Sequence, residues 1–182
     1  MPSTKLLSLA CLLIWSCEKL PVIDFANPLD VRQSQNDGIL LPALVFYPDS
    51  VVMKTGETAR VTLFAMEVQG LSAARVQIDY EHQKLNLVSN AAGDILQSLT
   101  NPFFQVEDDT ANGVIDIFTV SYGVDSLKTV TGTGSLAVLE FQATAPGKII
   151  LEYTDACEFV DHDDNPITIE SRLRGVLDVS DN

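Results

Sequence analysis

The stretch over residues 70–96, GLSAARVQIDYEHQKLNLVSNAAGDIL, most constrains how this chain can fold. Val76, Ile78 and Tyr80 alternate with polar residues, and a period of two is typical of a strand with one buried face. A polar turn over residues 81–84 follows, and alternating leucines then begin a second strand. The β-branched and aromatic residues fall at even spacing, which favours strands over a helix. The stretch therefore predicts two strands joined by a short turn.

The same pattern of short strands and turns continues along the chain. Asn112–Gly113 is a strong hairpin signal, and Pro146–Gly147 marks a second tight turn. Between them, residues 114–120 carry large apolar side chains on both faces, which predicts a central strand. Turn signals separate about nine short strands, and no segment has a convincing helical period. The sequence predicts an all-β fold with two packed antiparallel sheets.

Composition limits the classes of function. The chain has 182 residues, of which 46% are hydrophobic, enough for one folded domain and a targeting segment. Its formal net charge is -14, and such a surface repels phosphate backbones, so we expect no nucleic-acid partner. The acidity is consistent with a solvated surface or with binding of divalent cations.

The N-terminus resembles a bacterial lipoprotein signal peptide. Lys5 precedes a short apolar run that ends in a small residue, Ser16, directly before Cys17. The run is too short to span a bilayer stably. The resemblance implies that residues 1–16 are removed and that Cys17 is lipidated. The protein would then be anchored by lipid to a membrane of the bacterial cell envelope, facing the periplasm or the cell surface. An ordinary secretory signal is the alternative.

Two further segments follow. Residues 17–41 contain Pro, Asn, Asp and Gly without a sustained period, which predicts a flexible tether with little regular structure. The folded domain is predicted over residues 42–182.

An acidic loop is the strongest metal candidate. Asp161, Asp163 and Asn165 have the alternating spacing with which oxygen ligands can wrap a calcium ion. Pro166 stands where an EF-hand requires glycine, and Arg172 stands where it requires glutamate, so an EF-hand is excluded. The sequence leaves open either a calcium site or a solvated loop.

No constellation of catalytic residues is visible, so we expect a protein that is not an enzyme. The two histidines, His82 and His162, have no partner at metal-ligand spacing. Cys157 lies in a strand-like stretch and is expected to be a buried structural thiol. Phe103 and Phe104 are either an exposed recognition edge or part of the core.

The ordered series of motifs resembles the cohesin modules of cellulosome scaffold proteins and, more broadly, related carbohydrate-binding sandwich modules. The resemblance covers about residues 43–180 and rests on an ordered set of segments: GETARVTL, the stretch over residues 70–96, NGVIDIFTVSYG, GTGSLAVLEFQATAPGKIIL, CEFVDHDDNPITIE and GVLDV. It implies a nine-stranded jelly-roll β-sandwich without catalytic machinery, which binds dockerins, small calcium-loop modules of other proteins, through one sheet face.

The resemblance also implies which residues contact the partner. Many cohesins carry an Asn and an Asp on the strand that corresponds to residues 71–80, and Ala73 and Arg75 stand at those positions here. We expect the partner-binding residues to be Ala73, Arg75, Gln77, Asp79 and Glu81. Ala73 and Arg75 replace those polar groups by a methyl group and a fixed cation. The resemblance therefore supports the expected fold more strongly than it supports a dockerin as the partner. A polysaccharide ligand or a structural role in the envelope remains the alternative.

Overall fold

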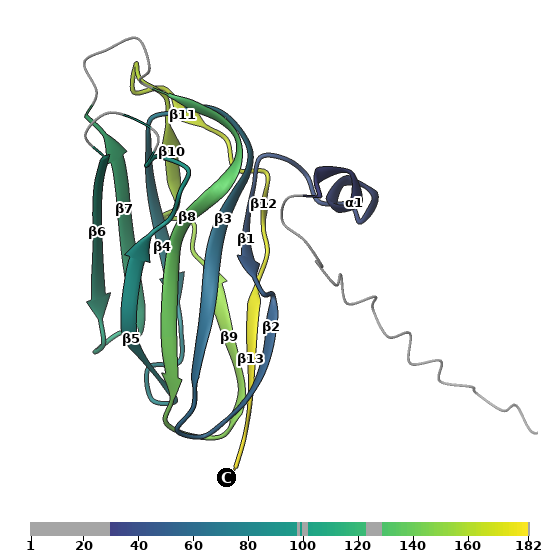
Figure 1. The fold of residues 1–182 in the computed structure, drawn as a ribbon, viewed down its shortest axis with the longest axis vertical. Coiled ribbons are helices and arrows are strands. Elements are labelled where there is room, and N and C mark those ends of the chain that lie inside the picture. Colours follow the sequence, from purple (N-terminus) through teal and green to yellow (C-terminus); the bar gives the residue numbers. More distant parts are fainter. Residues whose placement is uncertain (1–29, 98, 100–101, 123–128, 182) are drawn as a thin grey trace, which may run out of the picture.

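The computed structural model describes residues 30–97, 99, 102–122 and 129–181. Within these residues the chain forms one short helix and thirteen strands, arranged as two sheets packed face to face (Figure 1). The predicted all-β sandwich is confirmed, but the expectation of purely antiparallel sheets is wrong: residues 43–44 pair parallel with residues 171–172, and residues 50–54 pair parallel with residues 176–180. The strand count exceeds the expected nine, in part because several short segments of two or three residues also pair with the sheets.

The first sheet has five strands in the order β12-β1-β3-β8-β5. Its strands are β1 (Ala43–Tyr47), β3 (Thr58–Leu71), β5 (Leu85–Ala92), β8 (Val130–Ala143) and β12 (Ser171–Arg172). The two longest strands, β3 and β8, pair antiparallel with register shifts along their length. These shifts let two 14-residue strands bend around the core.

The second sheet has eight strands. They are β2 (Ser50–Lys54), β4 (Ala73–Asp79), β6 (Pro102–Asp109), β7 (Val114–Ser121), β9 (Gly147–Tyr153), β10 (Glu158–Val160), β11 (Pro166–Ile167) and β13 (Gly175–Ser180). On one side, β4 pairs with β7, which in turn pairs with β6. On its other side, β4 pairs with β10 near its start and with β9 near its end.

The main core lies between the two sheets. The inward residues of β4 and β7, such as Val76, Ile78, Ile115 and Ile117, are fully buried against residues of β3 and β8. Their alternation along each strand is the period of two that the sequence predicted. The central position predicted for β7 is confirmed by its two pairing partners, although its outward side chains are only half-buried.

A helix lies in the segment that the sequence predicted to be irregular. Helix α1 (Val31–Asn36) begins at Asp30, whose carboxylate accepts a hydrogen bond from the backbone N–H of Gln33 at 3.0 Å. The chain then returns to the sandwich, where Ile39 is buried against Val45 and other residues on the outer side of β1 and β3. The expectation of little regular structure is therefore wrong for residues 31–36. Packing of a few apolar side chains orders a segment that has no helical period of its own.

None of the helical residues that the structure describes forms a segment long and apolar enough to cross a membrane.

Candidate functional site

Strand β4 presents four of the five predicted partner-binding residues on one side. Ala73, Arg75, Gln77 and Asp79 point outward, because they alternate with Ala74, Val76 and Ile78, which are buried in the core. The outward residues therefore lie in a line along the outer surface of the second sheet.

The neighbouring strands extend this line into a grid. Antiparallel pairing places outward residues of β6, β7 and β10 directly beside those of β4. We call this surface the candidate face. Its rows across the strands are Val160, Ala73, Val120 and Phe103; Glu158, Arg75, Phe118 and Gln105; Gln77, Asp116 and Glu107; and Asp79, Val114 and Asp109.

A hydrogen-bonded network fixes the centre of the candidate face. Nε of Arg75 donates to Oδ1 of Asp116 at 2.9 Å, and its Nη2 lies 2.8 Å from the same oxygen. The Gln77 amide donates to both Asp116 oxygens, at 3.2 and 3.0 Å, and its own oxygen accepts from the Thr154 hydroxyl at 2.8 Å. The guanidinium carbon of Arg75 also lies 5.7 Å from the centre of the Phe118 ring. These contacts hold side chains that would otherwise move freely in solvent.

An apolar depression lies beside this network. It has a volume of about 190 Å³ and is lined by Ala73, Ala74, Arg75, Phe118, Val120, Glu158 and Val160. Ala73 is the smallest outward residue of its row, and the valines of β10 and β7 flank it on both sides. The depression exists because a methyl group stands where a longer side chain would fill the space.

The remaining outward charges on the candidate face are negative. Asp79, Glu107, Asp109 and Glu158 are exposed, and Arg75 is the one basic residue among the rows given above. The arginine is already paired with Asp116, so it does not offset the other carboxylates. A partner with a basic surface would be attracted to this face.

Glu81 lies outside the grid. It follows β4 in the turn and forms a salt bridge with Lys84, with Nζ 2.6 Å from Oε2. The structure thus brings Ala73, Arg75, Gln77 and Asp79 together on one face and places Glu81 at its end. A role for any of the five in partner binding stays a prediction.

Comparison with known proteins identifies the family. A family model described as the cohesin domain matches residues 45–173. This chain belongs to the cohesin domain family. Cohesin domains are non-catalytic binding modules. A comparison with curated proteins gave no significant match.

Solved cohesin structures share the fold. A non-cellulosomal cohesin from the archaeon Archaeoglobus fulgidus has a TM-score of 0.62 and 17% identity, covering 76% of this chain and 90% of that chain. The sixth cohesin of scaffoldin B from Acetivibrio cellulolyticus, in complex with a mutant Cel5 dockerin, has a TM-score of 0.64 and 21% identity, with 76% and 98% covered. A type I complex from Clostridium thermocellum, Coh-OlpA-Doc918, has a TM-score of 0.63 and 15% identity, with the same coverage.

The acidic loop of this cohesin domain is held by its own hydrogen bonds. Oδ1 of Asp161 accepts from the backbone N–H groups of Asp163 at 2.8 Å and of Asn165 at 2.9 Å. The Asn165 side-chain amide also donates to both Asp161 oxygens, and these hydrogen bonds, that of the amide first, lower the pKa of Asp161. Within the described ranges, no group of three or more acidic, histidine or cysteine side chains is placed to hold a metal ion. A calcium site at Asp161, Asp163 and Asn165 stays a sequence prediction.

The lone cysteine of the cohesin domain is buried, as the sequence predicted. The Cys157 thiol lies beneath the candidate face, where its Sγ is 3.4 Å from both the backbone N and the backbone O of Gln77. Burial raises the pKa of this thiol, which makes it a poor nucleophile.

Sequence reasoning missed the contribution of β7 to the candidate face. Asp116, Phe118 and Val120 complete the network and the depression, yet none was singled out. The available signal was the apolar character of both faces of this strand. One face packs in the core, whereas the other lies on the outer surface.

Proposed function

We propose that this chain binds a dockerin-like protein module through the candidate face. The observation that carries the proposal is the ordered centre of that face, where Arg75, Gln77 and Asp116 are fixed beside an apolar depression. Preordered side chains lose little entropy on binding, and protein interfaces usually combine apolar contacts with directed hydrogen bonds to polar groups. Two of the solved relatives described above are complexes with dockerins.

The proposed activity is binding without catalysis. Membership of a family of non-catalytic binding modules supports this proposal. The buried, protonated Cys157 and the hydrogen-bonded Asp161 fit structural roles rather than chemistry on a substrate.

The experiment is affinity capture from a lysate of the source organism with the purified full chain as bait, with and without a calcium chelator. We expect a protein with a dockerin sequence to be retained and to be lost on chelation. Arg75→Glu should reduce its capture by at least tenfold, because it replaces the salt bridge with Asp116 by two carboxylates that repel each other and so disorders the network. Gln105→Arg should have a similar effect, because it places a positive charge where a basic partner would dock. Arg60→Glu is the matched control, since Arg60 lies on β3 of the other sheet.

Equal capture by all three variants would place the binding surface elsewhere. Retention of no dockerin-bearing protein by the folded chain would reject the proposal. Circular dichroism and thermal unfolding of each variant establish that the domain remains folded.

Polysaccharide binding is the second candidate. Phe103 and Tyr122 are exposed at one end of the candidate face, with ring centres 6.0 Å apart and ring planes at 61°. Exposed aromatic rings of this kind can stack on sugars. A glycan panel probed with the wild type and with Tyr122→Ala tests this candidate, and binding that is abolished by the substitution would support it.

We also propose that the chain is anchored to a membrane of the cell envelope by lipid on Cys17. The support is the apolar run and small residue before Cys17, which lies outside the described residues. In cells fed a labelled fatty acid, we expect the wild-type chain to carry label and sediment with membranes. Cys17→Ser should lose both properties, whereas Cys157→Ser should keep them. Label that persists in Cys17→Ser would reject the anchor.

A further inference from the structure

The depression over Ala73 has a surface suited to one apolar side chain. Val160 and Val120 flank Ala73 in register on the two neighbouring strands, and Phe118 borders the depression one row further along. Two charged residues line the depression, Arg75 and Glu158, and the Arg75 guanidinium is already engaged by Asp116. The walls formed by Ala73, Val120 and Val160 carry no polar side-chain group, so a polar side chain seated against them would lose water without gaining a partner there.

Glu158 is the charged group beside this depression that has no partner. Glu158 lies on β10, directly opposite Arg75 of β4. Its side chain makes no hydrogen bond or salt bridge with the part of the chain that the structure describes. The guanidinium of Arg75, which lies opposite Glu158 on β4, is directed toward Asp116 instead. An exposed carboxylate at the edge of an apolar depression is positioned to pair with a cation that a partner brings.

The rest of the candidate face reinforces this preference for a cation. Asp79, Glu107 and Asp109 add negative charge around the network, and the chain as a whole carries a net charge of -14. An acidic partner surface would be repelled, and an uncharged one would leave Glu158 partly desolvated without compensation.

We propose that the partner seats one apolar side chain in the depression over Ala73 and pairs a neighbouring lysine or arginine with Glu158. This inference rests on the proposed function, since it assumes that a dockerin-like module occupies the candidate face. Specificity for the partner at this position then comes from the apolar depression over Ala73 and from the Glu158 carboxylate. This recognition chemistry differs from that of the many cohesins that carry an Asn and an Asp on the corresponding strand.

The probe that tests the inference is a phage-displayed library built on a dockerin module, with its solvent-exposed positions randomised. The library is selected on the purified full chain, and binders that are lost on both Arg75→Glu and Gln105→Arg but kept on Arg60→Glu are retained as binders of the candidate face. We expect these binders to share an apolar residue close to a lysine or arginine.

Substitutions in the chain then test each half of the inference. Ala73→Leu fills the depression and should weaken the retained binders by at least tenfold, whereas Ala73→Ser, which nearly keeps the volume, should weaken them by less than threefold. Glu158→Lys should also weaken them by about tenfold. Exchange of the binder's lysine or arginine for glutamate should restore affinity for Glu158→Lys alone. Thermal unfolding confirms that each variant is folded.

The outcomes separate the inference from the proposed function. Binders of the candidate face that tolerate both Ala73→Leu and Glu158→Lys, or that show no charge-swap rescue, would overturn the inference and leave the proposed function intact. A selection that yields no binder sensitive to Arg75→Glu and Gln105→Arg would overturn both.

Discussion

Arg75 on β4 and Asp116 on β7 form a salt bridge, with 2.8 Å between Nη2 and Oδ1, although 41 residues separate them in the sequence. The same carboxylate accepts hydrogen bonds from Gln77, so one acidic side chain holds two residues of the adjacent strand. This arrangement gives the candidate face an ordered centre before any partner arrives.

Asp116→Asn should remove the charge while keeping the shape of the side chain. We expect the free energy of unfolding to fall by about 0.5–1 kcal/mol, a small loss because the Arg75 side chain is 42% exposed and solvent screens the pair. Urea unfolding of Asp116→Asn, Arg75→Met and the double variant gives the coupling energy. Glu158→Gln is the control and should leave stability unchanged. A coupling energy of zero would show that the pair does not order the face.

Ile39→Ala tests whether the segment after α1 belongs to the folded domain. Ile39 is 5% exposed, whereas the adjacent Leu40 is 62% exposed. We expect Ile39→Ala to lower the free energy of unfolding by about 2 kcal/mol, because it opens a cavity against Val45 and Met66. Leu40→Ala should cost less than about 0.5 kcal/mol. Equal effects of the two substitutions in thermal unfolding would mean that the segment does not pack as described.

Two buried tyrosines should respond differently to loss of the hydroxyl group. The Tyr80 hydroxyl donates to Oδ1 of Asp108 at 2.8 Å, whereas the buried Tyr153 hydroxyl has no hydrogen-bond partner among the described residues. We expect Tyr80→Phe to cost about 1–2 kcal/mol and Tyr153→Phe to be neutral or stabilising. Urea unfolding at neutral pH measures both. A large loss in Tyr153→Phe would reveal a partner for that hydroxyl.

Stability should fall at alkaline pH. Burial is the first cause that raises the pKa of Cys157 above its usual 9.0 and those of Tyr80 and Tyr153 above their usual 10.0. The unfolded chain therefore loses these protons at lower pH than the folded chain, so the free energy of unfolding declines as pH rises past 9. Below that pH the stabilisation is complete. Urea unfolding between pH 7 and about 11 measures the decline.

Variants identify the groups that cause this alkaline decline. Tyr153→Phe should make it shallower, whereas Tyr47→Phe, which changes a surface residue, should leave the slope as it is. A slope that is identical in the wild type and in Tyr153→Phe would exclude the buried tyrosine as a cause.

Gly113 is the glycine of the hairpin between β6 and β7, and it should not tolerate a side chain. Its φ is +71°, and a Cβ would lie 2.4 Å from the backbone oxygen of Tyr80. We expect Gly113→Ala to cost about 3 kcal/mol, from strain together with the clash. Gly70 has a similar φ of +67° but open space around it, so Gly70→Ala should cost only about 1 kcal/mol. If both cost the same in urea unfolding, the clash is relieved by movement of the turn.

The strands could be predicted from the sequence because their signals are local. The alternation of inward and outward side chains predicted β4 and β7, and the Asn112–Gly113 pair predicted the hairpin turn before β7. Helix α1 was missed because it has six residues and no helical period, and its segment is ordered by contacts of Ile39 with β1 and β3. Such contacts depend on the tertiary fold and leave no local pattern.

The candidate site could be predicted only in part. The family resemblance singled out Ala73 and Arg75, which the structure places together on the candidate face. The partners of Arg75 and Gln77 required knowledge of the register between β4 and β7. Asp116 and Thr154 lie 39 and 77 residues from Gln77, and no spacing rule links positions so far apart. The spacing of the acidic loop predicts a calcium site, which stays a prediction, whereas the hydrogen bonds by which the Asp161 carboxylate organises the loop are visible only in the structure.

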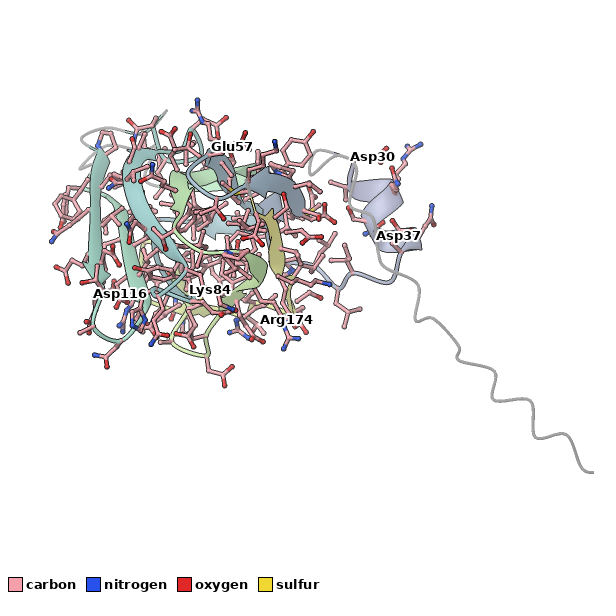
Figure 2. The ribbon with its side chains drawn as sticks, turned by 90° about the horizontal axis from the view of Figure 1, so that it is seen from below. Asp30, Asp37, Glu57, Lys84, Asp116 and Arg174 are labelled. Carbon is pink, nitrogen blue, oxygen red and sulfur yellow. The ribbon has the colours of Figure 1, made fainter. Side chains whose placement is uncertain are left out.

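The position of α1 determines how a pulling force would travel through the molecule. The ends of α1, marked by Asp30 and Asp37, lie on the side of the sandwich away from Asp116 (Figure 2). Tension between the N-terminal segment and a partner held at the candidate face would therefore cross the body of the domain. The first strand to take that load is β1, which is bonded to β3 on one side and to β12 on the other. The rate at which the domain unfolds under force would then be set by the rate at which the hydrogen bonds between β1 and these two strands break.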